Sequence, residues 1–390
     1  MPIKFCIICV CSALVFSNCS KNDNDPVPSP QLSIASIYPT TAKGGETITI
    51  KGQHLLVDGA NLKVMVNNKQ ANLISSGNDS IKAIVPQRAG SGNISIVTNA
   101  KTYSGPPFTY DYIVKVTTIA GTGNPGNNDG PAQSASFKCP WGVTIDKNGD
   151  IYIADSYNRL IRKIDTSTKT VSSMSPGSLV FYSPYNITID TISKSLYVTD
   201  FNDHLLKINA SGSMSVIFVD PQPLAGIGIG PDTRLYMSNN TTGQLLRVDT
   251  NGQNRTLFSS GMTTPRNIIF DKDGKMYVAG VGIYKVESNG SFSQVMSNPS
   301  QFHGWEVAVD TLGNFYEADH FNNLVRKIDK TGTITVIAGS GTASDVDGIG
   351  TQASFDGPMG IAIDKEGSLY ITTYNFSSGF GNKVRKISFY

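Results

Sequence analysis

One sequence unit recurs six times between residue 113 and the C-terminus, and it constrains the fold more than any other feature of this chain. Each copy contains an apolar segment whose sixth position is usually aspartate. In order, these sixth positions are Asp146, Asp190, Gly230, Asp271, Asp310 and Asp364. Their spacing is about 40 residues, and such a period with several short strands per repeat is the signature of a β-propeller.

Each copy also predicts its own strands. A turn of the form Asp-x-x-Gly, such as residues 146–149, connects the first apolar segment to a second one in most copies. Glycine there supplies the positive φ that a tight hairpin needs. The second segment carries a tyrosine at a fixed place: Tyr152, Tyr197, Tyr236, Tyr277, Tyr316 and Tyr370. A repeated aromatic of this kind predicts packing between neighbouring blades.

The two ends of the repeat region predict how the ring closes. The chain ends at Tyr390, directly after a third strand, so the sixth copy lacks a fourth strand of its own. Residues 115–120 repeat the fourth-strand pattern of residues 334–339. We therefore expect residues 115–120 to complete the sixth blade, since closing the ring removes exposed sheet edges.

The segment that precedes the repeats predicts a separate β domain. Residues 32–112 contain short alternating runs such as Thr47-Ile48-Thr49-Ile50, punctuated by glycine and proline. This pattern is typical of an antiparallel sandwich with one buried face per sheet. The net charge of +2 shows no basic excess, so a nucleic-acid partner is not expected.

The N-terminus predicts export and a lipid anchor. Lys4 precedes an apolar stretch over residues 5–16, which is too short to span a bilayer. Cys19 follows, and the stretch resembles a bacterial lipoprotein signal of the Bacteroidetes type, which implies lipidation of Cys19. We expect a signal peptide at 1–18, a polar tether at 19–31 and anchoring at the outer membrane, on the cell surface, with no other membrane contact. An ordinary signal peptide cut elsewhere is the alternative.

Two family resemblances agree with this division. Residues 37–52 (Ile37-Tyr38-Pro39 through Gly44-Gly45 to Gly52), with Val85-Pro86 and residues 108–110, resemble the IPT/TIG family of immunoglobulin-like domains. Pro140-Trp141-Gly142, the strand Ile151–Asp155 and the Arg-Lys-Ile-Asp motif at 162–165 resemble NHL repeats. The predicted fold class is thus all-β: an IPT/TIG sandwich at 32–112, followed at 113–390 by a six-bladed NHL-type propeller.

The repeat alignment places a candidate ligand site at one mouth of the propeller channel. Loops that lead into first strands and loops that follow second strands share one face. The predicted ligand-binding residues on this face are Trp141, Asp155, Tyr185, Arg266, Trp305, Glu306, Asp319 and His320. Aromatic planes beside polar groups suit a glycan or a protein ligand. The alternative is that the two tryptophans only pack these loops against each other.

The fifth blade deviates most from the repeat. Glu306 stands where other copies have Gly or Asn, and Glu317 stands where they have Ile, Val or Met. His303 and His320 flank these carboxylates, so the cluster is open to three interpretations: metal binding, general-base chemistry, or pairing of Glu317 with a nearby Arg or Lys. No metal motif is recognisable, and we predict no metal or other cofactor.

The sequence as a whole favours a binding protein over an enzyme. We expect a non-catalytic, surface-anchored module that binds glycan or protein at the channel mouth. The alternative is a propeller enzyme, a metal-assisted lyase or a lactonase-like hydrolase. Of the five cysteines, only Cys139 lies beyond residue 19, so a disulfide framework is excluded, and Cys139 is expected to be a small buried side chain.

Overall fold

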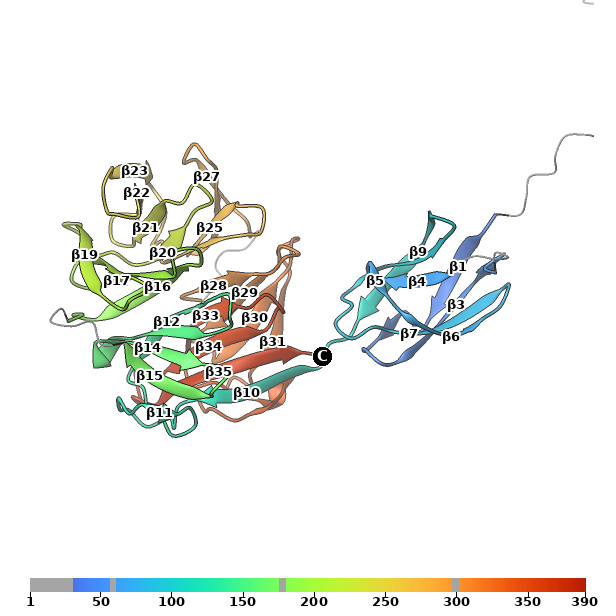
Figure 1. Cartoon of the computed structure of the whole chain (residues 1–390), viewed down its shortest axis with the longest axis horizontal. Helices are drawn as coiled ribbons and strands as arrows, with labels where there is room; N and C mark the ends of the chain where they lie inside the picture. Colours follow the sequence, from blue (N-terminus) through green and yellow to red (C-terminus); the bar gives the residue numbers. More distant parts are fainter. Residues whose placement is uncertain (1–30, 57–60, 175–179, 297–301, 303) are drawn as a thin grey trace, which may run out of the picture. The chain divides into compact units, whose positions relative to one another are not determined.

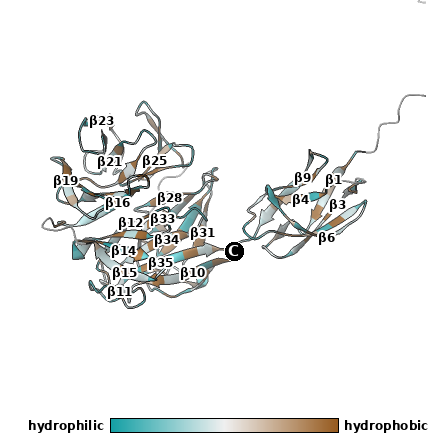
Figure 2. Cartoon of the chain, in the orientation of Figure 1, coloured by the Kyte–Doolittle hydropathy of each residue, from teal (hydrophilic) through white to brown (hydrophobic). Residues whose placement is uncertain are grey.

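The structure is a computed structural model that describes residues 31–56, 61–174, 180–296, 302 and 304–390. The chain divides into two compact units between Thr109 and Tyr110. Both units are built from β-strands, and the hydrophobic residues are concentrated along these strands (Figures 1 and 2). The described part of the chain contains no apolar helix of membrane-spanning length. The predicted signal peptide, Cys19 and the tether up to residue 30 lie outside the described residues.

The first unit contains two sheets of four and five strands. The strands of one sheet, in spatial order, are β1 (Ser33–Tyr38), β3 (Thr47–Gln53), β7 (Ser80–Ile84) and β6 (Asn72–Ser76). Those of the other are β2 (Thr41–Ala42), β9 (Lys101–Tyr110), β8 (Gly92–Thr98), β4 (Lys63–Val66) and β5 (Lys69–Gln70). Alternate residues such as Ile48 and Ile50 are fully buried, as the period-2 pattern predicts.

The second unit contains six sheets, one for each sequence repeat, and they are the blades of the propeller (Figure 1). The four strands of blades 1, 2 and 3 are β12 (Pro140–Ile145), β13 (Ile151–Asp155), β14 (Leu160–Asp165), β15 (Thr170–Met174); β16 (Pro184–Asp190), β17 (Ser195–Asp200), β18 (His204–Ile208), β19 (Met214–Val219); β20 (Ile227–Ile229), β21 (Leu235–Asn239), β22 (Gln244–Val248), β23 (Thr256–Ser259). Those of blades 4 and 5 are β24 (Asn267–Phe270), β25 (Met276–Gly280), β26 (Gly282–Val286), β27 (Phe292–Gln294); β28 (Val307–Val309), β29 (Phe315–Asp319), β30 (Leu324–Ile328), β31 (Ile334–Ala338).

The sixth blade confirms the predicted closure. Its strands are β33 (Pro358–Ile363), β34 (Leu369–Tyr374), β35 (Gly381–Phe389) and β10 (Val114–Ala120). Strand β10 is antiparallel to β35, with Val116 opposite Ile387. The first strands of adjacent blades contact each other around the whole ring, including β12 against β33. The strand before the first blade thus completes the last one, and the ring has no open seam.

Packing between blades forms the core of the propeller. Separate apolar clusters lie between successive blades, and each contains or contacts one of the six repeated tyrosines. Tyr197 of blade 2, for example, packs with Leu235 and Met237 of blade 3. The prediction that these tyrosines are inter-blade core residues is confirmed.

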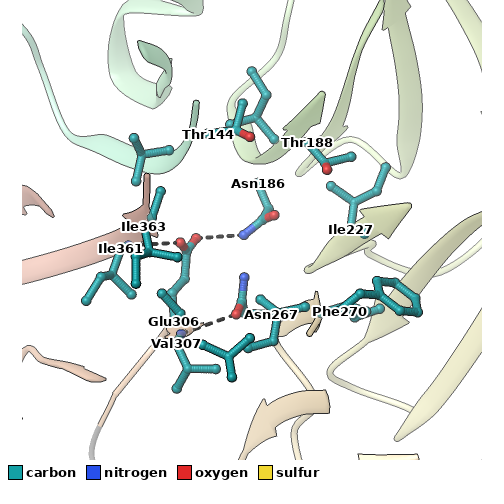
Figure 3. Close-up of a pocket in the computed structure, with 18 of the residues that line it drawn as sticks. Thr144, Asn186, Thr188, Ile227, Asn267, Phe270, Glu306, Val307, Ile361 and Ile363 are labelled. Carbon is teal, nitrogen blue, oxygen red and sulfur yellow. Dashed lines mark hydrogen bonds between the residues drawn. The ribbon is translucent and has the colours of Figure 1, made fainter. Parts of the chain in front are cut away.

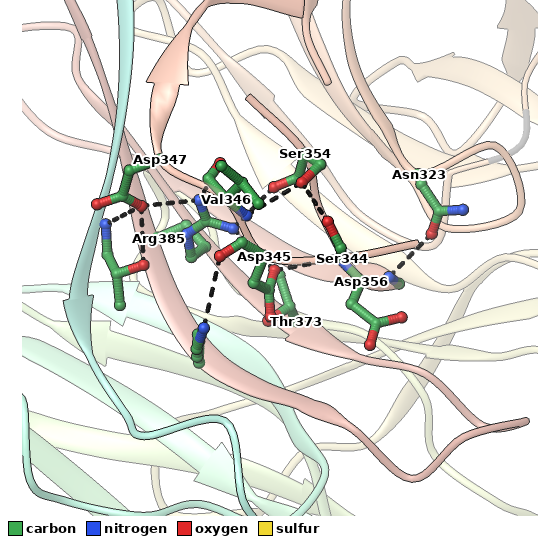
Figure 4. A network of polar contacts seen from close by, with 12 residues as sticks. Asn323, Ser344, Asp345, Val346, Asp347, Ser354, Asp356, Thr373 and Arg385 are labelled. Atoms are coloured by element: carbon green, nitrogen blue, oxygen red, sulfur yellow. Dashed lines mark hydrogen bonds and ion pairs between the residues drawn. The ribbon is translucent and has the colours of Figure 1, made fainter. Parts of the chain in front are cut away.

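Two long inserts reinforce the outer edges of blades 1 and 6. Strand β11 (Gly130–Pro131) pairs with β15, and β32 (Gly348–Ile349) pairs with β10. Each insert is fixed by a fully buried arginine, Arg162 or Arg385. Arg385 binds Asp345 at 2.7 Å and Asp347 at 2.9 Å (Figure 4), and Arg162 binds Asp129 at 2.7 Å. Asp347 also accepts from the backbone N–H of Thr118, so the clamp in blade 6 holds the closing strand itself.

Candidate functional site

Two successive positions at or just before the start of each first strand define one end of the central channel. The residues at the first position are Trp141, Tyr185, Ala225, Arg266, Trp305 and Met359. Those at the second position are Gly142, Asn186, Gly226, Asn267, Glu306 and Gly360. We call the face that carries the first position the loop face, and the opposite face, with the hairpins between first and second strands, the hairpin face.

Aromatic side chains close the channel at the loop face. The ring of Trp141 lies 4.5 Å from Tyr185, 5.3 Å from Trp305 and 5.6 Å from Phe376, measured between centroids. Phe201 lies 4.7 Å from Tyr185. Several of these pairs are tilted or edge-to-face, the arrangements that aromatic quadrupoles favour. We call these five residues the aromatic layer. Trp141 and Tyr185 are only 5% and 4% exposed, so packing is a large part of their role.

The outer edge of the aromatic layer remains open to solvent. Phe201 and Phe376 are each 44% exposed, and Phe321 beside His320 is 66% exposed. These phenylalanines lie in loops that follow second strands. Tyr157 has the same place in blade 1, and it is 50% exposed. Sequence reasoning missed all four, although an aromatic residue one or two positions after the second strand recurs in blades 1, 2, 5 and 6. Large exposed apolar groups gathered on one face mark an interaction site.

Trp305 is the residue of the aromatic layer that contacts polar side chains. The guanidinium of Arg266 lies 4.4 Å from the centroid of the Trp305 ring, a cation–π contact. His320 contacts the same ring at 6.3 Å, and burial lowers the pKa of His320. Within the described residues, the indole N–H groups of Trp141 and Trp305 and Nδ1 of His320 have no hydrogen-bond partner. All three atoms are themselves buried beneath the partly exposed aromatic surface.

Glu306 lies directly below the aromatic layer. Its Oε1 accepts a 2.6 Å hydrogen bond from the side chain of Asn186, and its Oε2 accepts one of 3.2 Å from the backbone N–H of Ile361 (Figure 3). Burial in an environment of neutral partners raises the pKa of Glu306 to about 8. Burial raises the pKa of Tyr185, with a smaller contribution from the nearby Glu306 carboxylate, so this tyrosine stays protonated.

Asp155 and Asp319 do not reach the channel surface, and their predicted contact with a ligand stays a prediction. Both are fully buried, and both pair at 3.0 Å with an arginine seven residues later, Arg162 or Arg326. Asp155 also accepts from the backbone N–H of Lys138 at 2.7 Å. These carboxylates hold the loops of their own blades in place.

The fifth-blade cluster divides in the structure. Glu317 is fully buried and pairs with Arg326 at 2.8 Å. Of the three interpretations of this cluster, the structure therefore shows the pairing of Glu317 with a nearby arginine. Glu306 and His320 both border the aromatic layer, whereas His303 lies outside the described residues. Among the described residues, no group of three or more His, Cys, Asp or Glu side chains is placed to hold a metal ion. Cys139 is buried, as expected, and its thiol is free.

The predicted site residues that come together are therefore Trp141, Tyr185, Arg266, Trp305, Glu306 and His320. Their role in ligand binding stays a prediction. The first two are largely buried, so Arg266, Trp305 and His320, together with the exposed phenylalanines, form the accessible surface of the loop face.

Comparisons with known proteins place both units. An IPT/TIG domain model matches residues 32–110, and a Teneurin NHL domain model matches residues 115–305. NHL repeat-containing protein 2 from Bos taurus is 26% identical over 310 residues, which are 65% of this chain and 40% of that protein. Protein SUPPRESSOR OF QUENCHING 1, chloroplastic, from Arabidopsis thaliana is 21% identical over 299 residues, 67% of this chain and 26% of that protein. The chain thus spans less than half the length of these curated relatives.

Solved structures resemble the chain over most of its length. A structural genomics protein of unknown function from Bacteroides thetaiotaomicron VPI-5482 has a TM-score of 0.68 at 21% identity and covers 93% of this chain and 99% of its own. An auxiliary nutrient binding protein from Bacteroides ovatus ATCC 8483 has a TM-score of 0.58 at 20% identity, with coverages of 93% and 99%. A gluconolactonase from Xanthomonas campestris has a TM-score of 0.52 at 11% identity, with coverages of 71% and 90%. At these identities the likeness concerns the fold.

Proposed function

Since the chain joins an IPT/TIG domain to an NHL-type β-propeller, we propose that it is a non-catalytic binding protein of the cell surface that takes its ligand at the loop face. The observation that carries this proposal is the group of exposed phenylalanines around the half-buried Trp305. Burying such side chains against a partner is favourable by about 25 cal/mol per Å² of apolar surface. The likeness in fold to proteins described as auxiliary nutrient binding proteins supports a binding role.

A protein ligand suits this surface better than a glycan. The exposed rings of Phe201, Phe321 and Phe376 carry no hydroxyl or N–H, whereas a sugar needs hydrogen-bond partners for its hydroxyls. Aromatic residues and arginine are enriched in the cores of protein interfaces, and Arg266 stacked on Trp305 is a combination of that kind. A glycan that stacks on Trp305 and bonds to Arg266 is the second ligand class.

The N-terminal segment supports a location at the outer membrane. A lipidated Cys19 followed by a polar tether to residue 31 would anchor the protein through acyl chains, with the IPT/TIG domain between anchor and propeller. The propeller would then be free to meet partners outside the membrane.

Binding arrays with matched variants test the proposed site. Peptide, protein and glycan arrays would be probed with the chain from residue 20 onward, as wild type, Trp305→Ala, Phe376→Ala and Leu312→Ala. Leu312 is 51% exposed in a hairpin of blade 5 and serves as the control on the hairpin face. We expect hits whose signal falls at least tenfold in both loop-face variants and is unchanged in Leu312→Ala. Array signals that are unchanged in both loop-face variants would overturn the proposed site. The type of array that gives the signals decides the ligand class.

A propeller enzyme is the second candidate, and Glu306 is the observation that favours it. A buried carboxyl group whose pKa is raised to about 8 has the proton affinity of a general base near neutral pH. The likeness in fold to a gluconolactonase is consistent with such chemistry in a six-bladed propeller. Metal analysis of the purified protein separates the candidates, because a stoichiometric, tightly held Zn²⁺ or Ca²⁺ at the channel would favour the enzyme.

A further inference from the structure

The central channel contains a cavity of about 300 Å³ that is lined by the first strands of all six blades. The cavity does not extend to the loop face, because none of the six first-position side chains lines it. Trp141 and Tyr185 of the aromatic layer, with Ala225 and Met359 beside them, are all at most 5% exposed, so together they close this end of the cavity as a floor. The volume is at the lower end of the range for small-molecule sites.

The opposite end of the cavity is open at the hairpin face. The lining residues nearest the hairpins, including Thr144, Thr188, Phe270 and Ile363, are partly exposed, whereas Asn186 and Glu306 near the floor are buried. The channel is therefore a blind well, with its mouth at the hairpin face and its floor beneath the aromatic layer. We call this cavity the channel well.

Glu306 gives the floor of the channel well a specific chemistry. Its carboxylate, with the side chains of Asn186 and Asn267, points into the centre of the well (Figure 3). Glu306 is the only ionisable side chain among the described residues that line the well, and its hydrogen-bond partners are a neutral amide and a backbone N–H. Each carboxylate oxygen accepts one bond here, so lone pairs remain for a ligand.

The walls between floor and mouth are formed by the strand positions that alternate with the inter-blade core residues. These positions carry Thr144, Thr188, Gly228, Ile269, Ala308 and Ala362, so two hydroxyl groups stand among small and aliphatic side chains. A ligand that suits this arrangement has a short, partly apolar body and one cationic, hydrogen-donating end.

We propose that the channel well binds a small organic cation, an ammonium group on a short apolar body, whose charge pairs with Glu306. An ammonium group supplies the counter-charge that this carboxylate lacks, and charge-assisted hydrogen bonds of this kind are the strong ones. A metal ion suits the well less, because no group of three or more His, Cys, Asp or Glu ligands is assembled in the described residues. The inference does not rest on the proposed function, since the aromatic layer separates the two sites.

Binding of the cation is coupled to a proton. With a pKa raised to about 8, Glu306 is mostly protonated at pH 7, and pairing with an ammonium group would require release of that proton. Tyr185 beside Glu306 keeps its proton throughout, because burial and the carboxylate both raise its pKa. Arg266, at the first position of blade 4, is held on the ring of Trp305. Ligand binding at pH 7 should therefore release up to one proton, and binding at pH 9.5 should release almost none.

The test compares three molecules of similar size: butylammonium, 1-butanol and butyrate. Isothermal calorimetry on the purified full chain at pH 7, in phosphate and in Tris, gives both affinity and proton release. We expect butylammonium to bind at least tenfold more tightly than 1-butanol, with heats that differ between the buffers. Equal affinity for 1-butanol and butylammonium, or no butylammonium binding to folded protein, would overturn the proposal.

Two variants locate the binding. Glu306→Gln should reduce butylammonium affinity to the level of 1-butanol, and Thr188→Phe, which fills the open end, should abolish binding of both. Thr188 lies at the hairpin end of the well, away from Glu306. Thr188→Phe therefore tests the well by itself if circular dichroism shows that Glu306→Gln folds poorly. Leu312→Ala, at an exposed residue that does not line the well, should leave butylammonium affinity within twofold of wild type. Unchanged binding in both Glu306→Gln and Thr188→Phe would contradict the proposed well, whatever the outcome at the loop face.

Discussion

The two ends of the propeller channel differ because the repeat carries side chains of different size at two positions of the same strand. At the first position, four of the six blades supply Trp, Tyr, Trp and Met, and these side chains fill the centre of the ring. At the fourth position the residues are Thr144, Thr188, Gly228, Ile269, Ala308 and Ala362, and the centre stays open. Three positions along one strand therefore separate a closed floor from an open mouth.

This contrast also separates two kinds of chemistry. The loop face presents apolar rings to solvent, which suits a large partner that buries a broad surface. The hairpin face gives access to one buried carboxylate in a narrow space, which suits a small charged molecule. The aromatic layer keeps the two sites apart, so variants on either side should act independently.

The largest expected effect comes from removing the centre of the aromatic layer. Trp141 is 5% exposed and contacts Tyr185, Trp305 and Phe376. We expect Trp141→Ala to lower the free energy of unfolding by about 3–5 kcal/mol, since truncation of a buried aromatic loses its packing and leaves a cavity. Equilibrium unfolding in urea measures this change.

A matched substitution separates packing from the indole N–H. Trp141→Phe keeps an aromatic ring and removes a buried donor that has no partner within the described residues, so it should cost much less than Trp141→Ala. A loss below about 1 kcal/mol in Trp141→Ala would show that the layer does not close the channel by packing.

The second effect is a pH dependence that arises at the floor of the well. The folded state holds the pKa of Glu306 at about 8, above its ordinary value of 4.5. The unfolded chain therefore loses this proton first as pH rises, and Glu306 lowers stability progressively between those two values, by about 1.4 kcal/mol per pH unit. Glu306→Gln removes the titration, so the variant should gain stability relative to wild type between pH 5.5 and 7.5, by on the order of 1 kcal/mol or more.

Urea unfolding at several pH values checks this prediction. Glu287→Gln, the same chemical change at an exposed site, is the control. If the difference in unfolding free energy between Glu306→Gln and wild type is the same at pH 5.5 and 7.5, burial does not raise the pKa of Glu306 in the folded protein.

Local periodicity was enough to predict most of the fold. The six tyrosines, the Asp-x-x-Gly turns and the copy of the fourth-strand pattern at residues 115–120 are all features of neighbouring residues or of a fixed repeat. Gly149, Gly274, Gly313 and Gly367 have φ between 77° and 88°, as those hairpins require. The number of blades and the closing strand could be predicted because each follows from the repeat alone. The structure confirms both.

The contacts of individual site residues are harder to predict than the fold, because they depend on partners in adjacent strands. Asp155 and Asp319 share the loop side of their blades with the aromatic layer, and only the structure shows that they form buried ion pairs with Arg162 and Arg326 on the next strand. The recurrence of Asp and Arg seven residues apart in blades 1 and 5 was the available signal. The open well could not be predicted, because it depends on the combined volume of side chains from six blades.

The smallest expected effect lies at the exposed edge of the aromatic layer. Phe376 contacts Trp141 and Tyr374 but is 44% exposed, so its truncation loses only part of its packing and leaves no enclosed cavity. We expect Phe376→Ala to change the free energy of unfolding by less than about 1 kcal/mol, which is far below the effect of Trp141→Ala in the same cluster. Urea unfolding of both variants alongside Leu312→Ala, an exposed apolar truncation at the hairpin face, measures the comparison. A loss above about 2 kcal/mol in Phe376→Ala would mean that this ring seals the floor of the channel, and its exposed face would then no longer count as surface kept free for a partner.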